Sequence, residues 1–91
     1  MKLVRLHVII SGMVQGVFFR YNTIAKAREL GLKGWVRNTD EGKVEAVFEG
    51  EEKRVNEMLK WCQKGPPASR VDEVKISFEE HKGEFNSFER R

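Results

Sequence analysis

The chain has 91 residues, of which 40% are hydrophobic, and its 17 basic and 14 acidic side chains give a formal net charge of +3. This length predicts a single domain over residues 1–91 with one hydrophobic core, and so mild a charge does not by itself imply a nucleic-acid partner. One cysteine, Cys62, excludes an internal disulfide and favours a reducing compartment, and no apolar stretch is long enough to cross a membrane, so we expect a cytoplasmic protein with no membrane partner.

Residues 3–11 predict a strand with one buried face. Hydrophobic side chains alternate along it at Val4, Leu6, Val8 and Ile10, and the other face carries Arg5, His7 and Ser11. No second imidazole or carboxylate stands at ligand spacing from His7, so we assign this histidine no metal.

Residues 11–20, Ser-Gly-Met-Val-Gln-Gly-Val-Phe-Phe-Arg, join this strand to a helix. Gly12 and Gly16 permit backbone conformations that turn several N–H groups toward one point, and the first turn of a helix adds unpaired N–H donors. The guanidinium of Arg20 fits two oxygens of a phosphate or carboxylate. The stretch therefore predicts an oxyanion site, the alternative being a tight connection followed by a solvated arginine.

A helix is predicted over residues 22–30, followed by a hairpin. Ile24, Ala27 and Leu30 have helical spacing, and Gly31 follows as a helix-ending residue. The hairpin strands are 34–38 and 43–49, joined by a turn; Val44, Ala46 and Phe48 form the expected buried row, and Val47 lies in the opposite row.

The second helix is predicted over residues 51–64, after Gly50 ends the strand. Its apolar stripe is Val55, Met58, Leu59 and Cys62, which places Cys62 in the core and Trp61 at the edge of the stripe. A strand over 70–78 follows, with Val74, Ile76 and Phe78 on one side. Phe85 and Phe88 indicate a last short extended segment, and His81 lies in a charged turn where we expect it to be solvated.

The predicted order is strand, helix, strand, strand, helix, strand. This βαββαβ pattern predicts an α+β sandwich, in which two helices cover one face of an antiparallel sheet.

The missing motifs restrict the chemistry. The sequence has no Ser or Cys paired with a His, no metal-ligand cluster and no Gly-Lys-Ser/Thr phosphate loop. An enzyme of this kind would hold an anion and orient water, which suits an acyl phosphate because its carboxylate leaving group, with a conjugate acid of pKa about 4, departs without a proton. Asn38 is the candidate for orienting the water, since a neutral amide does not repel phosphate; otherwise it only begins a turn.

Two long motifs resemble the signatures of the acylphosphatase family. They are Gly12–Arg20 and Gly34–Asn38, the latter followed by Gly42-Lys43-Val44-Glu45, and the likeness continues through Phe48-Glu49-Gly50 and Gly65-Pro66-Pro67 to Arg70-Val71. Met13 stands where a basic residue is common, and Glu41 precedes Gly42 where Asp-Gly is usual. The first departure would weaken phosphate attraction, and the second would change only turn geometry.

This resemblance implies a ferredoxin-like fold and hydrolysis of acyl phosphates without metal, cofactor or covalent enzyme intermediate. It implies that Arg20 and the backbone N–H groups of the anion loop, which we define as residues 15–20, bind the phosphoryl group. The residues concerned are Gln15, Gly16, Val17, Phe18, Phe19 and Arg20. Asn38 would position the attacking water.

Two other functions compete with this one. RNA-recognition modules share the fold class, but they need aromatic residues on the sheet, where residues 43–49 supply valine and glutamate. A non-catalytic module that only binds phosphate or another oxyanion is the second. With a small-molecule acyl phosphate as the expected partner, we expect a monomer.

Overall fold

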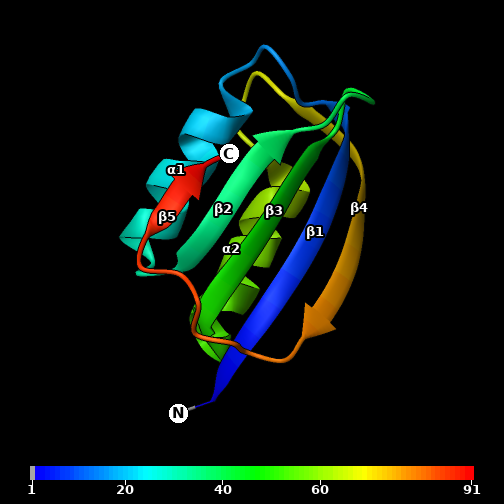
Figure 1. Cartoon of the computed structure of the whole chain (residues 1–91). Coiled ribbons are helices and arrows are strands. Elements are labelled where there is room, and N and C mark those ends of the chain that lie inside the picture. Colours follow the sequence, from blue (N-terminus) through cyan, green and yellow to red (C-terminus); the bar gives the residue numbers. More distant parts are fainter. Residues whose placement is uncertain (1) are drawn as a thin grey trace.

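The computed structural model describes residues 2–91 and has the ferredoxin-like fold. Its elements are β1 (Leu3–Met13), α1 (Phe19–Glu29), β2 (Lys33–Asn38), β3 (Val44–Glu51), α2 (Glu52–Lys64), β4 (Arg70–Glu79) and β5 (Phe88–Arg90). The sheet order is β4-β1-β3-β2-β5 (Figure 1). The predicted βαββαβ order is confirmed, but the sheet is mixed rather than antiparallel, because β5 pairs parallel to β2.

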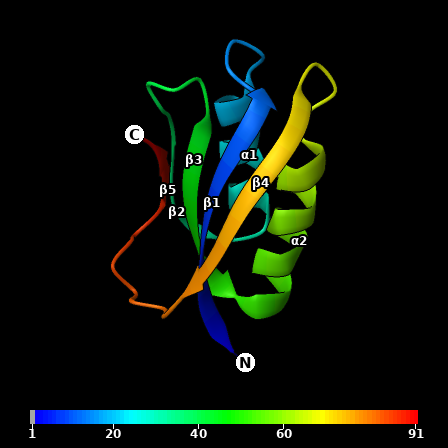
Figure 2. The same cartoon turned by 90° about the vertical axis from the view of Figure 1, so that its right-hand side faces the viewer.

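Both helices cover the same face of the sheet, and the core lies between the two layers (Figure 2). Leu6, Val8 and Ile10 of β1 are fully buried there, as alternation predicts. From α2, Met58 and Cys62 fill the same core, and burial raises the pKa of the Cys62 thiol. Hence Cys62 is a core residue, as expected.

Trp61 packs at the edge of the helical stripe, as predicted. Its ring meets that of Phe19 edge to face, with the ring centres 5.7 Å apart. Since Phe19 is the first residue of α1 and is buried, this contact joins the starting turn of α1 to the end of α2.

One prediction about the strands is wrong, that Gly50 ends the hairpin strand, and burial along the strands depends on position in the sheet. Ile76 and Phe78 are 43% and 53% exposed, since β4 is an edge strand with a neighbouring strand on one side only. Val47 is buried although it faces away from the helices, because β3 is central and the neighbours of Val47 in the register flank it. Gly50 does not end β3, which continues in register with β1.

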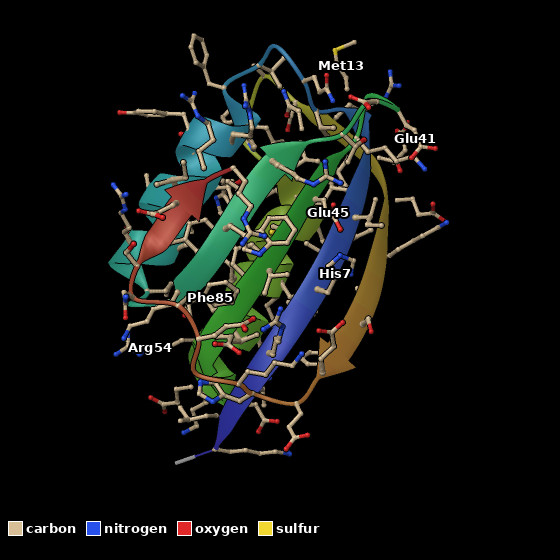
Figure 3. All side chains as sticks on the ribbon, viewed as in Figure 1. His7, Met13, Glu41, Glu45, Arg54 and Phe85 are labelled. Carbon is tan, nitrogen blue, oxygen red and sulfur yellow. The ribbon has the colours of Figure 1, made fainter. Side chains whose placement is uncertain are left out.

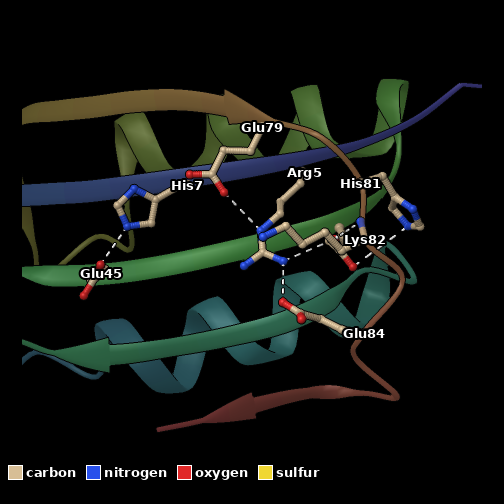
Figure 4. Close-up of polar contacts among 8 residues, drawn as sticks. Arg5, His7, Glu45, Glu79, His81, Lys82 and Glu84 are labelled. Atoms are coloured by element: carbon tan, nitrogen blue, oxygen red, sulfur yellow. Dashed lines mark hydrogen bonds and ion pairs between the residues drawn. The ribbon is translucent and has the colours of Figure 1, made fainter.

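A charged cluster on the face without helices holds the C-terminal segment against the sheet (Figure 4). The buried guanidinium of Arg5 lies 2.6 Å from Glu84, 3.1 Å from Glu79 and 3.5 Å from the buried Glu49. Glu49 also accepts a hydrogen bond of 2.8 Å from the backbone N–H of Lys82. Residues 80–87 are thereby fixed, and they deliver β5 to the edge of the sheet beside β2.

His81 belongs to the same region and is not simply solvated, contrary to our expectation. It is half-buried, and its Nε2 lies 3.9 Å from the Glu49 carboxylate.

The Arg5 cluster predicts how stability responds to acid. The hydrogen bond from Arg5 lowers the pKa of Glu84 below its ordinary value of 4.5. Because the folded pKa is depressed, the stabilising contribution is complete above pH 4.5 and is lost as pH falls through the folded value. Glu84→Gln should therefore lower the unfolding midpoint in urea at neutral pH, and this difference from wild type should close in acid.

Glu80→Gln is the matched control, because Glu80 is exposed and forms no ion pair within residues 2–91. Its urea midpoint should follow that of the wild type at every pH. A difference between Glu84→Gln and wild type that stays constant from neutral pH to acid would contradict the assignment.

Candidate active site

The connection from β1 to α1 begins later than the sequence indicated, because β1 continues to Met13. The pairing of β1 with β4 shifts register between Ser11 and Gly12, because Asp72 of β4 is an extra residue there, and Gly12 has φ +132°. A Cβ atom there would stand 2.1 Å from the carbonyl oxygen of Arg70. Gly12 therefore allows the close approach of β4, and it does not shape the anion loop as we had expected.

Two left-handed residues fold the loop between β1 and α1. Gly16 has φ +76° and Phe18 has φ +59°, the latter being the only non-glycine residue with positive φ among residues 2–91. Phe18 immediately precedes α1, so the helix starts at Phe19, three residues before the predicted Asn22. Burial of the Phe19 ring against Trp61 is the tertiary contact that favours the earlier start.

The backbone N–H groups of the anion loop are free to bind a ligand. Within residues 2–91, none of those from Gln15 to Arg20 donates a hydrogen bond to another residue. No side chain caps the first turn of α1 either. A loop of unpaired donors that leads into the positive end of a helix is suited to an anion.

The side chain of Gln15 joins the loop to the β2–β3 hairpin. Its Nε2 donates to the carbonyl oxygens of Thr39 at 3.0 Å and Lys43 at 2.9 Å. The Thr39 hydroxyl oxygen accepts the N–H of Lys43 at 3.1 Å, which closes the same turn. Because Thr39 follows Asn38, these bonds tie the position of the anion loop to that of Asn38. Sequence reasoning assigned Gln15 only a backbone role and missed this one.

A groove of about 950 Å³ lies where the anion loop, α1, the end of β2 and β5 meet. The residues that line it are Val14, Gly16, Phe18, Phe19, Arg20, Tyr21, Ile24, Ala25, Arg28, Asn38, Glu89 and Arg90. Arg20 and Asn38 thus border one cavity, although 18 positions separate them in the sequence. Of the expected binding residues, Gln15 and Val17 do not line the groove; Val17 instead packs against the core.

Neither Arg20 nor Asn38 has a side-chain hydrogen bond or ion pair with another residue of the described range 2–91. Arg20 is half-buried and forms no ion pair within the described part of the chain. The Oδ1 atom of Asn38 is buried and accepts no hydrogen bond from residues 2–91. A buried acceptor of this kind is costly unless a bound molecule satisfies it, so the geometry favours a small donor such as water.

Three further groove residues were not found from the sequence. Tyr21 is 71% exposed on the rim, and Arg28 and Arg90 come from α1 and β5. Helical spacing from Arg20 could have placed Arg28 on the groove side of α1, but nothing in the sequence indicated that β5 would close the other side.

The two departures from the family motifs lie at the same end of the molecule as the anion loop (Figure 3). Met13 is 53% exposed and Glu41 is exposed in the hairpin turn, and neither lines the groove. The effect of Met13 on phosphate attraction remains a prediction.

Within residues 2–91, no helix is both long and apolar enough to cross a membrane. Among the same residues, no three His, Cys, Asp or Glu side chains are grouped so as to hold a metal ion.

Three kinds of comparison with known proteins indicate the same family. The acylphosphatase family model matches residues 6–90. A protein named acylphosphatase from Trichormus variabilis is 54% identical over 82 residues, which cover 90% of this chain and 81% of the relative. Another, from Pelotomaculum thermopropionicum, is 46% identical over 88 residues, covering 97% and 96%. The solved structure of an acylphosphatase from Coxiella burnetii superimposes with a TM-score of 0.92 at 38% identity, over 98% of this chain and 93% of that one.

Proposed function

The chain belongs to the acylphosphatase family, and from this membership we propose that it hydrolyses the carboxyl–phosphate bond of acyl phosphates to a carboxylate and inorganic phosphate. The observation that carries the mechanism is the shared groove: Arg20 of the anion loop and Asn38, whose buried Oδ1 is unpaired within residues 2–91, line the same cavity. One side of the groove supplies donors for an anion, and the other supplies an acceptor for water.

The phosphoryl group binds in the anion loop. Unpaired N–H groups from Gln15 to Arg20 donate to its oxygens, and the guanidinium of Arg20 donates two further hydrogen bonds. The positive end of α1 adds to the attraction. Since these donors are already in place, they stabilise the charge that spreads over the phosphoryl oxygens in the transition state without reorganising.

Asn38 aims the attacking water. Its Oδ1 accepts a hydrogen bond from the water and so directs a lone pair of the water oxygen at phosphorus. The hydrogen bonds of Gln15 to Thr39 and Lys43 keep this amide at a constant distance from the anion loop. A neutral amide suits this task because a carboxylate at the same place would repel the phosphoryl oxygens.

The reaction needs no proton donor for its leaving group. Water forms the new P–O bond, and the bond from phosphorus to the acyl oxygen breaks with its electron pair remaining on the carboxylate. The protons of the water pass to phosphate and solvent. A carboxylate with a conjugate acid of pKa about 4 leaves unaided, whereas the more basic alkoxide or phenoxide of a phosphate monoester does not.

One assay tests this proposal. The purified, chelator-treated protein should hydrolyse benzoyl phosphate, and inorganic phosphate should inhibit it competitively, because product and substrate share the anion loop. A phosphate monoester such as phenyl phosphate should be cleaved at a rate lower by at least about 10³-fold, since its leaving group requires protonation.

The outcomes also separate the alternatives. Phosphate binding without turnover of benzoyl phosphate would indicate a non-catalytic anion-binding module. Equal cleavage of the ester and the acyl phosphate would contradict the argument from the leaving group.

A further inference from the structure

The groove continues well beyond the part that a phosphoryl group occupies. From Arg20 at the start of α1 it runs along the helix, past Tyr21 and Ile24, to Arg28. Eight helical residues separate the two arginines, a rise of about 12 Å. A phosphoryl group in the anion loop therefore leaves most of the about 950 Å³ to the acyl part of the substrate.

The wall opposite α1 is β5, and strand geometry determines which of its side chains face the groove. Phe88 is buried in the core, stacked on Phe48, so it lies on the helix side of the sheet. Side chains of a strand alternate, and Arg90 pairs with the fully buried Val36, so Arg90 lies on this same side of the sheet, the side that the helices cover. Glu89 belongs to the opposite face, where its register partner is Trp35.

Arg90 lies farther along the groove than Asn38. Its register partner on β2, Val36, precedes Asn38 by two residues, so Arg90 and Asn38 are about 7 Å apart along the strand direction. Arg90 forms no ion pair within residues 2–91. Its guanidinium is therefore available to a ligand in the groove.

Arg28 fixes the far end of the groove. Its Nε and Nη2 donate to the carbonyl oxygen of Phe88 at 3.2 Å and 3.0 Å, which joins α1 to β5. Arg28 nevertheless lines the groove, as Arg90 does, so both positive charges belong to it. Three arginines thus line this cavity, but only one carboxylate of residues 2–91 does, that of Glu89. The position of Glu89 in its strand directs the side chain to the face of the sheet without helices.

We propose that Arg90, with Arg28 behind it, forms a second anion subsite that binds a carboxylate at the far end of the acyl group. The subsite rests on the proposed function and defines a substrate class: acyl phosphates that carry a second negative charge a few bonds from the acyl carbon. The middle of the acyl chain packs on Tyr21 and Ile24, while the phosphoryl group stays in the anion loop.

Two substrates of equal chain length test the subsite. Glutaryl phosphate carries a terminal carboxylate, and pentanoyl phosphate ends in a methyl group. The wild-type protein should give a kcat/KM for glutaryl phosphate that is higher by about threefold to tenfold, as a partly exposed charge pair with an arginine allows. This preference should fall as salt is added, because the pair is accessible to solvent.

Arg90→Gln should abolish the preference, measured as the ratio of the two kcat/KM values. Arg91→Gln is the matched control, because it removes the same charge one residue along, where the guanidinium lies 4.7 Å above the Trp35 ring. It should preserve the ratio. Glutarate should also inhibit the wild-type protein competitively and more strongly than pentanoate does, which tests the subsite without any variant.

The outcomes distinguish a failure of the subsite from a failure of the proposed function. If the wild-type protein hydrolyses both substrates equally well, or if Arg90→Gln and Arg91→Gln change the ratio equally, the subsite is wrong while the proposed function stands. If the wild-type protein hydrolyses neither substrate, the proposed function itself fails.

Discussion

Replacement of Asn38 by alanine is expected to lower kcat for benzoyl phosphate by roughly 10²- to 10³-fold while phosphate still binds. The variant would lose only the group that aims the water, and loss of positioning in a reaction of this kind has effects of that size. KM and the inhibition constant of phosphate should change by less than about threefold, because Arg20 and the free N–H groups of the anion loop are untouched.

The same variant should fold as well as the wild type. The buried Oδ1 of Asn38 accepts no hydrogen bond from residues 2–91, so alanine removes an unpaired polar atom rather than a bond. The free energy of unfolding should stay the same or rise by up to about 1 kcal/mol. Asn56→Ala, on the exposed side of α2, is the control and should leave kcat unchanged. A kcat for Asn38→Ala near that of the wild type would disprove the role of this residue.

Arg20→Ala is expected to weaken the binding of substrate and phosphate more than it slows the chemical step. The substitution removes the one side-chain guanidinium of the anion loop, so kcat/KM should fall by roughly 10²- to 10³-fold and phosphate should no longer inhibit. Arg20→Lys should recover only a small part of this loss, because an ammonium carries the charge without the planar pair of donors. Steady-state kinetics and calorimetric titration with phosphate measure both effects.

Arg54→Ala provides the control for a simple change of net charge. Arg54 lies on α2 outside the groove, at the other end of the molecule from Met13 and the anion loop (Figure 3). It should bind phosphate as the wild type does. If Arg20→Ala kept the wild-type affinity for phosphate and lost only turnover, the assignment of phosphoryl binding to Arg20 would be wrong.

Residues with a regular pattern were predicted well because burial follows local periodicity. The alternation from Val4 to Ile10 and the stripe from Val55 to Cys62 place their side chains in the core as expected. Edge and centre positions were not predictable in this way. Ile76 follows the same alternation as Val8 but is 43% exposed, since the order of the strands places β1 inside the sheet and β4 at its edge.

The first helix illustrates a second limit. Helical spacing alone began it at Asn22, after the last glycine and the aromatic pair. The structure begins it at Phe19, because the ring of that residue is buried against Trp61 from α2, more than 40 positions away. Such a contact is invisible to local propensity, and tertiary packing overrides it.

By itself, the sequence determined the chemistry that is available to this protein. It supplies a loop that can turn its amides outward, one arginine at the start of a helix and one neutral amide before a turn, and it shows no motif in which a Ser or Cys is paired with a His. Local residue types carry that information because donors and acceptors are properties of single side chains.

Only the tertiary structure decided where these groups meet. Folding brings β2 beside β3 and β5 beside β2, and the side chain of Gln15 bridges the anion loop to the hairpin that carries Asn38. The Arg5 cluster holds the C-terminal segment so that Arg90 borders the groove. These placements depend on pairings between residues far apart in the chain, and no local pattern encodes such pairings because they result from packing of the whole core.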